Sequence, residues 1–220
     1  VTYQIALEYR NMGAYGEALL YLDKIESRNI NQEKGRIYWM RAKSYLRVEA
    51  WVAALHDLEE AILHNYARPE VFEARGQIYL QQKDYLKAYE LFEKAFTLNK
   101  SANTFLNLTN IQYFNLSQKE EAISKIEQYI KENGHDFNLS MQLLAFYEKE
   151  QKTGKIIPLL KEMYSEYKKN NEALMFSKTK ILLIKYIAKD NVGMAINFLE
   201  ENKEEDEILL NLYKITNQPS

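Results

Sequence analysis

The chain has 220 residues, with 29 Lys and Arg against 31 Asp and Glu, so its formal net charge is −2 at pH 7. It contains no Cys, which excludes a disulfide scaffold, a Cys-ligated metal site and thiol catalysis, and the balanced charge argues against a general nucleic-acid binder. Only 7 Gly and 3 Pro occur, and because strands and tight turns use both residues, the composition predicts helices joined by short turns.

A repeat of about 34 residues runs along the chain and is marked by tyrosines. They stand at Tyr9, Tyr45, Tyr79, Tyr113, Tyr147 and Tyr186, separated by 36, 34, 34, 34 and 39 residues. Three further series keep this register: Ala6, Ala42, Gly76, Asn110, Leu144 and Leu183; Ala18, Ala54, Ala88, Ala122, Ile156 and Ala195; and Leu22, Leu58, Phe92, Ile126, Leu160 and Leu199. Because positions three and four apart share a helix face, each unit is predicted to be a helical hairpin in which a small residue lets two helices approach closely.

In chain order, the repeat predicts six hairpins within one solenoid that spans residues 1–220. They occupy about 1–30, 33–66, 69–100, 103–134, 137–170 and 172–203, and a helix at about 205–215 is predicted to cap the open end. Six glycines are interpreted as turn or junction residues and only Gly76 as helical. Pro69 is predicted to begin a helix, since the first helical position does not need an N–H group.

The third unit shows the full pattern of a known repeat. Between Pro69 and Lys100 it has Phe72, Gly76, Tyr79, Tyr85, Ala88, Phe92 and Ala95. This pattern resembles the tetratricopeptide repeat (TPR), and the resemblance covers nearly the whole chain, weakening from the fourth unit onwards. It implies an all-α, α-α superhelix of antiparallel hairpins, whose concave groove holds extended peptides or partner helices.

The first helix of each unit is predicted to line that groove. The candidate partner-binding residues are Tyr3, Leu7, Arg10, Arg36, Trp39, Lys43, Arg47, Glu73, Gln77, Asn107 and Ile111, with Glu70, Gln81, Thr104 and Phe114 on the same faces. All seven arginines precede residue 77, and Arg is suited to bidentate recognition of carboxylates. We therefore expect a partner with acidic and aromatic character on the first two units. The alternative is that these arginines lie on solvated ridges and Trp39 packs against its neighbouring unit. The Lys and Asn clamp by which some members of the family grip a chaperone tail is not retained.

Nothing in the sequence indicates catalysis. The three histidines, His56, His64 and His135, lack metal-ligand spacing, and neither a phosphate-binding Gly-rich loop nor a nucleophile elbow occurs. We expect no catalytic residue, no cofactor and no metal. The sequence indicates a non-enzymatic protein–protein interaction scaffold that binds a peptide or protein partner. The alternatives are a ligand-responsive regulatory domain and a substrate-recruiting arm of a larger enzyme.

The apolar runs are too short for a membrane span. The stretch from Ile181 to Ile187 is interpreted either as a buried sixth unit or as a homodimer seam. The chain begins at Val1 within a helical pattern and is expected to be a trimmed piece. Cytoplasmic and exported (periplasmic or lipid-anchored) locations are therefore both left open. Its abundant Lys, Asn, Ile and Tyr indicate an A·T-rich, bacterial genome.

Overall fold

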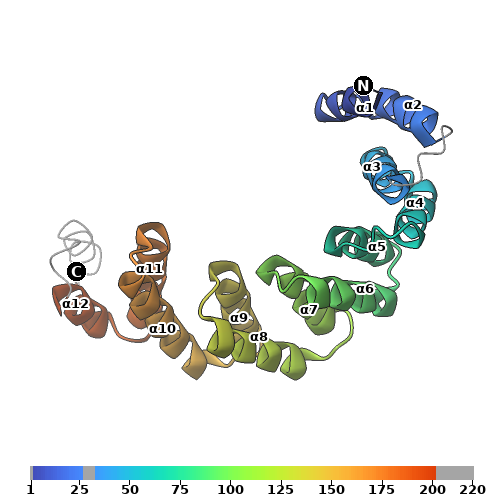
Figure 1. The fold of residues 1–220 in the computed structure, drawn as a ribbon. Helices are drawn as coiled ribbons and strands as arrows, with labels where there is room; N and C mark the ends of the chain where they lie inside the picture. The colour runs from blue at the N-terminus through green and yellow to red at the C-terminus, as the bar shows by residue number, and fades with distance from the viewer. Residues whose placement is uncertain (1, 27–32, 202–220) are drawn as a thin grey trace. The chain divides into compact units, whose positions relative to one another are not determined.

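The computed structural model describes residues 2–26 and 33–201, and all of the regular structure in these two ranges is helical (Figure 1). Twelve α-helices and one short 3-10 helix follow one another within them. The chain divides into two compact units, Val1–Ala122 and Ile123–Ser220, and each unit is described by itself.

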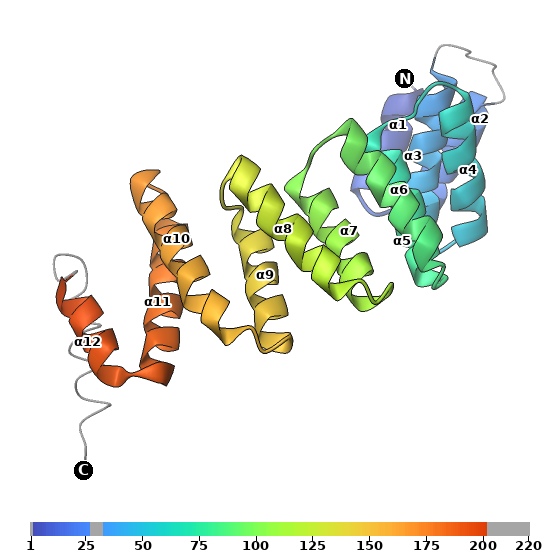
Figure 2. The same cartoon turned by 90° about the horizontal axis from the view of Figure 1, so that it is seen from below.

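The first unit is built from helical hairpins. Its helices are α1 (Thr2–Asn11), α2 (Tyr15–Glu26), α3 (Lys34–Arg47), α4 (Trp51–Leu63), α5 (Pro69–Gln81), α6 (Tyr85–Leu98), α7 (Ala102–Phe114) and the first residues of α8 (Lys119–Asn133). Helices α1 and α2, α3 and α4, and α5 and α6 pack pairwise, and α2, α4 and α6 each pack against the next helix in the chain (Figure 2). Pro69 is the first residue of α5, as predicted.

The second unit continues the succession of helices. It contains the rest of α8, then α9 (Phe137–Lys149), a 3-10 helix at Thr153–Lys155, α10 (Ile156–Lys169), α11 (Ala173–Asp190) and α12 (Val192–Glu201). Helix α10 packs against both α9 and α11, and α11 packs against α12. The predicted all-α class of packed helical hairpins is confirmed. The boundaries of the six repeat units stay a prediction, and the capping helix at about 205–215 lies outside the described residues.

The repeated positions form the core, which explains why they recur. Exposed fractions are 0% for Ala18, Ala54, Ala88, Ala122 and Ala195, and no more than 2% for Leu22, Leu58, Phe92, Ile126, Leu160 and Leu199. Each alanine and the large residue four positions later lie on one face of the second helix of a hairpin. Burial of this stripe against neighbouring helices is what stabilises each unit, at about 25 cal/mol per Å² of apolar surface.

Two glycines are needed for close helix packing. A Cβ atom on Gly76 would lie 2.9 Å from Cε2 of Phe92, which fits its predicted contact role. The interpretation of Gly16, Gly35 and Gly193 as turn or junction residues is wrong, because they lie in the first turns of α2, α3 and α12, and Gly35 is also buried. A Cβ on Gly35 would lie 2.6 Å from the carbonyl oxygen of His64. Gly35 therefore serves the packing of α3 against the end of α4.

The turn after the first helix of a hairpin has a repeated backbone geometry. Glu49, Lys83, Ser117 and Gln151 recur every 34 residues with φ of 58°, 62°, 59° and 55°. In three of the turns the carbonyl of the repeated tyrosine accepts a hydrogen bond of 2.8–2.9 Å from the amide five residues later, as from Asp84 to Tyr79. This is the hydrogen-bond pattern of a left-handed helix terminus. The tyrosine period therefore coincides with the period at which helices end.

The apolar stretch of α11 is mostly interior. Leu183, Ile184 and Ile187 have exposed fractions of 0%, 3% and 7%, whereas Ile181 is 53% exposed. This burial favours the interpretation of a buried sixth unit, and a homodimer seam stays a prediction. Among the described helices, none is both long and apolar enough to cross a membrane.

Candidate functional site

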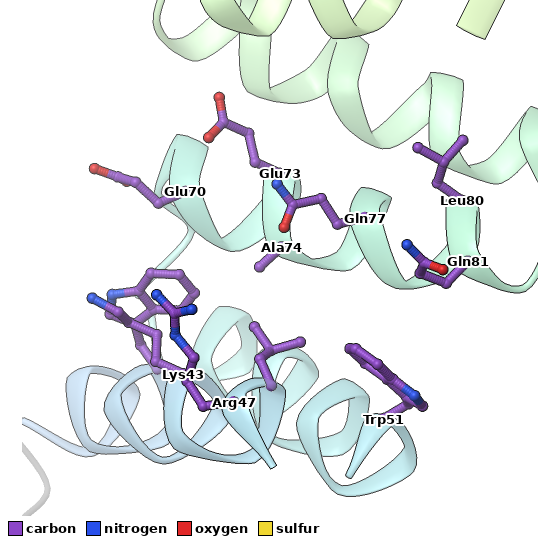
Figure 3. A pocket seen from close by; sticks show the side chains of 11 residues that line it. Lys43, Arg47, Trp51, Glu70, Glu73, Ala74, Gln77, Leu80 and Gln81 are labelled. Atoms are coloured by element: carbon purple, nitrogen blue, oxygen red, sulfur yellow. The ribbon is translucent and has the colours of Figure 1, made fainter. Parts of the chain in front are cut away.

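A groove of about 510 Å³ opens between α3 and α5 in the first unit (Figure 3). It is lined by Trp39, Lys43, Leu46, Arg47, Trp51, Glu70, Glu73, Ala74, Gln77, Leu80 and Gln81. Helix periodicity explains this set. Trp39, Lys43 and Arg47 are spaced by four residues on α3, and the α5 residues recur at intervals of three and four, so each helix turns one face to the groove.

The α3 side of the groove is basic. Burial and the positive charge of Arg10 lower the pKa of Lys43 from its ordinary value of 10.5, Arg47 acts in the same direction, and Glu70 opposes them. The Nζ atom of Lys43 also lies 5.4 Å from the ring centroid of Trp39. Lys43 and Arg47 therefore lie near each other at the groove, and an anionic group bound there would relieve the repulsion that Lys43 experiences from Arg47 and Arg10.

The α5 side of the groove is acidic. Glu70 is exposed at the start of α5, and the hydroxyl of Thr104 on α7 donates a hydrogen bond to Oε1 of Glu73. Within the described residues, no ion pair joins Lys43 or Arg47 to either glutamate. Positive and negative charges thus face each other across the groove without being paired.

The end of the groove near the C-termini of α3 and α5 is apolar. Leu46 and Leu80 reach it from α3 and α5, and Trp51 reaches it from the first turn of α4. Figure 3 shows Trp51, Leu80 and Gln81 at the end of the groove opposite Glu70 and Lys43. Trp51 is 36% exposed, so part of its ring is available to a bound molecule.

The structure brings together only part of the predicted binding set. Trp39, Lys43, Arg47, Glu73 and Gln77 line the groove. The remaining candidates Tyr3, Leu7, Arg10, Arg36, Asn107 and Ile111 do not line it.

Their surroundings explain why these residues lie elsewhere. Tyr3 and Leu7 pack against a core cluster formed by residues of α1, α2 and α3. Arg36 lies over the ring of Tyr3, with Cζ 5.0 Å from the ring centroid. Ile111 is 2% exposed, so the prediction that it offers surface to a partner is wrong: its side chain belongs to the interior.

Sequence reasoning missed the apolar end of the groove. The predicted binding set did not include Trp51, Leu46 or Leu80, which line this end of the groove. A signal was present: Leu80 follows Gln77 by three positions, which continues the face of α5 that faces the groove. The position of Trp51 at the groove could not be predicted from the period of α3 or α5, because Trp51 reaches the groove from α4 through the tertiary packing.

Two of the described arginines form ion pairs between helices. Arg41 binds Asp57 at 2.6 Å from Nε to Oδ2 and at 2.7 Å from Nη2 to Oδ1. Nη2 of Arg75 lies 2.8 Å from Oε1 of Glu59. Concentration of Arg in the first third of the chain therefore reflects internal ion pairing as well as the groove.

The second unit contains a smaller hollow, of about 240 Å³. At its wall Oε1 of Glu127 accepts hydrogen bonds from the Tyr147 hydroxyl at 2.6 Å and from Nζ of Lys155 at 2.7 Å. Burial raises the pKa of Glu127, but these two donors outweigh it and hold the pKa below its ordinary value. Because this carboxylate is already satisfied by the protein, the groove of the first unit is the stronger candidate. In the part of the chain that the structure describes, no group of three or more His, Asp or Glu residues is placed to hold a metal ion.

The geometry can be compared with that of known proteins. The family model of the tetratricopeptide repeat matches residues 69–102. No curated protein matches the sequence.

Solved structures share the fold at low sequence identity. MamA is 15% identical with a TM-score of 0.62, covering 76% of this chain and 97% of its own. PilF of Pseudomonas aeruginosa is 16% identical with a TM-score of 0.57, covering 84% and 89%. YrrB, described as a TPR protein with an unusual peptide-binding site, is 15% identical with a TM-score of 0.58, covering 73% and 82%.

Tetratricopeptide repeats typically form interaction scaffolds without chemistry of their own. The matched repeat at residues 69–102 contains α5, which forms one wall of the groove. The twelve helices and the fold shared with MamA, PilF and YrrB extend the same construction over most of the chain. The chain therefore contains a tetratricopeptide repeat at residues 69–102 and shares its fold with these structures over most of its length.

Proposed function

We propose that this protein is an interaction scaffold whose groove between α3 and α5 holds an extended segment of a partner protein. The partner segment presents an acidic side chain to Lys43 and Arg47 and an aromatic side chain to the tryptophans. One observation carries the proposal: both tryptophans of the chain line the same groove as two cations, Lys43 and Arg47, that form no ion pair with any residue the structure describes.

The size and the chemistry of the groove support this function. A volume of about 510 Å³ falls within the range of pockets that enclose a ligand, about 300–1,000 Å³. Tryptophan and arginine are enriched among the residues that dominate binding energy at protein interfaces. The description of YrrB, which shares the fold, names a peptide-binding site in that protein, and this adds support for a peptide in the groove here.

A library of random peptides displayed on phage and selected on the immobilised protein tests the proposal. Selected peptides are then titrated by fluorescence anisotropy against the unaltered protein and the double variant Lys43→Glu/Arg47→Glu. We expect the double variant to bind about tenfold or more weakly, since it reverses both cations at the groove.

The matched control is Arg36→Glu, which reverses a cation on the same helix but outside the groove. Its affinity should equal that of the unaltered protein. Selection of no peptide, or equal binding by the double variant and the unaltered protein, would show that the groove is not the binding site.

A further inference from the structure

The groove separates basic from acidic residues across its width, and charged from apolar residues along its length. Across it, Lys43 and Arg47 on α3 face Glu70 and Glu73 on α5. Along it, this charged half is followed by an apolar half, and Figure 3 shows the charged side chains at one end and Trp51 with Leu80 at the other. A bound segment therefore meets opposite charges on its two sides and an apolar surface further on.

The opposed charges remain available to a partner. No ion pair crosses the groove within the residues described, although Glu70 is close enough to counteract the lowering of the pKa of Lys43. A segment that carries only acidic residues would satisfy the α3 side while approaching Glu70 and Glu73. A segment with one acidic and one basic side chain can satisfy both sides.

Backbone geometry gives the spacing that such a segment needs. Glu73 and Leu80 are seven residues apart on α5, and at a rise of about 1.5 Å per residue this is about 10 Å along the groove. An extended peptide covers that distance in about three residues, and its successive side chains point to opposite sides. Neighbouring acidic and basic residues can thus face the two walls, and an apolar residue about three positions away reaches the apolar half.

We infer that the groove recognises an extended segment of a partner protein with adjacent acidic and basic residues and a large apolar residue about three positions from the acidic one. This inference rests on the proposed function and specifies the partner of the same site. The basic residue pairs with Glu70 and Glu73, the acidic residue pairs with Lys43 and Arg47, and the apolar residue packs on Leu46, Trp51 and Leu80.

Four synthetic peptides test the spacing and the charge pair. Each is capped at both ends and embedded in the same Gly-Ser context. The first carries lysine, aspartate, two glycines and phenylalanine in that order. The second has the reverse order, because the direction of the chain in the groove is an outcome of the test. The third has the composition of the first with phenylalanine next to aspartate, and the fourth has a second aspartate in place of lysine.

We expect the first or the second peptide to bind about tenfold more tightly than the third, since an aromatic anchor that misses its pocket loses most of its contribution. The variant Glu70→Lys should reverse the preference between the first and the fourth peptide. The variant Glu90→Lys makes the same change on α6, outside the groove, and should leave that preference as it is.

Equal affinity for all four peptides would overturn the inference. If library-selected peptides still required Lys43 and Arg47, the proposed function would stand and only the specificity would be wrong. If no selected peptide required these two residues, the proposed function would fall as well.

Discussion

The guanidinium of Arg41 on α3 binds the buried carboxylate of Asp57 on α4 through two hydrogen bonds, of 2.6 and 2.7 Å. Asp57 is 1% exposed and the side chain of Arg41 is 12% exposed, and Nη1 of Arg41 also reaches Asp23 of the preceding hairpin at 2.9 Å. This network joins the first two hairpins behind the helix that carries Lys43 and Arg47. It therefore fixes one wall of the groove from the side opposite to the partner.

Removal of Asp57 alone should be strongly destabilising. Asp57→Ala leaves the guanidinium of Arg41 without its buried counter-charge, a change that costs about 3–5 kcal/mol in comparable sites. The double variant Arg41→Met/Asp57→Leu removes both charges and should unfold at a urea concentration close to that of the unaltered protein. Equal destabilisation by the single and the double variant would contradict this account of the pair.

Gly35→Ala should destabilise the second hairpin, because the added methyl group would meet the carbonyl oxygen of His64 at 2.6 Å. Such overpacking typically costs about 1–3 kcal/mol. The matched control is Gly16→Ala on α2, where nothing lies within 4 Å of the added atom; it should be stabilising by about 0.5–1 kcal/mol. Urea denaturation of both variants measures the contrast, and a loss of stability in Gly16→Ala of the same size would rule out the packing explanation.

Lys83→Gly should stabilise the third hairpin. Lys83 has a φ of 62°, in the left-handed region that glycine enters without the cost of about 1 kcal/mol that a Cβ atom imposes. Lys83→Ala removes the same side chain but keeps a Cβ, so it should not gain this stability. The midpoints of urea unfolding should follow the order Gly above Ala, and the reverse order would show that the turn geometry does not limit stability.

Stability of the second unit should fall in mild acid because of His135. Its side chain is 4% exposed, Nδ1 lies 2.9 Å from Oγ of Ser140, and burial lowers its pKa below the ordinary value of 6.5, against the opposing charges of Glu166 and Glu162. The unfolded chain therefore takes up this proton at a higher pH than the folded chain. The stability that the neutral, buried side chain of His135 contributes is therefore complete above about pH 6.5. It is lost as the pH falls from there through the lower pKa of His135 in the folded protein.

His135→Asn should flatten this pH dependence, since the replacement does not titrate. The free energy of unfolding, measured by urea denaturation from about pH 8 to about pH 5, gives the slope for both proteins. An identical slope in the variant would show that His135 does not set the acid sensitivity.

The buried alanines and the helix faces at the groove were predictable from the sequence. The recurring small residues were predicted to lie where two helices approach closely, and Ala54 and Ala88 of the alanine series are both 0% exposed. The faces of α3 and α5 that line the groove were predicted from the resemblance to the tetratricopeptide repeat together with helix periodicity, as Lys43 and Gln77 show.

The groove features that the sequence did not predict depend on contacts between helices. Trp51 reaches the groove from α4, and Ile111 is buried although its register resembles that of groove residues. Neither fact follows from the period of one helix. The left-handed turns were also hidden, because Glu49, Lys83, Ser117 and Gln151 are not glycines and share no side-chain chemistry.

The two tryptophans of the chain, Trp39 and Trp51, both line the groove and report directly on its occupancy. A library-selected peptide without tryptophan should be titrated into ¹⁵N-labelled protein while the two indole N–H resonances are followed by NMR. Both resonances should shift and saturate at the peptide concentration at which anisotropy saturates. If the peptide binds by anisotropy and both indole resonances stay in place, the groove between α3 and α5 is not where this protein holds its partner.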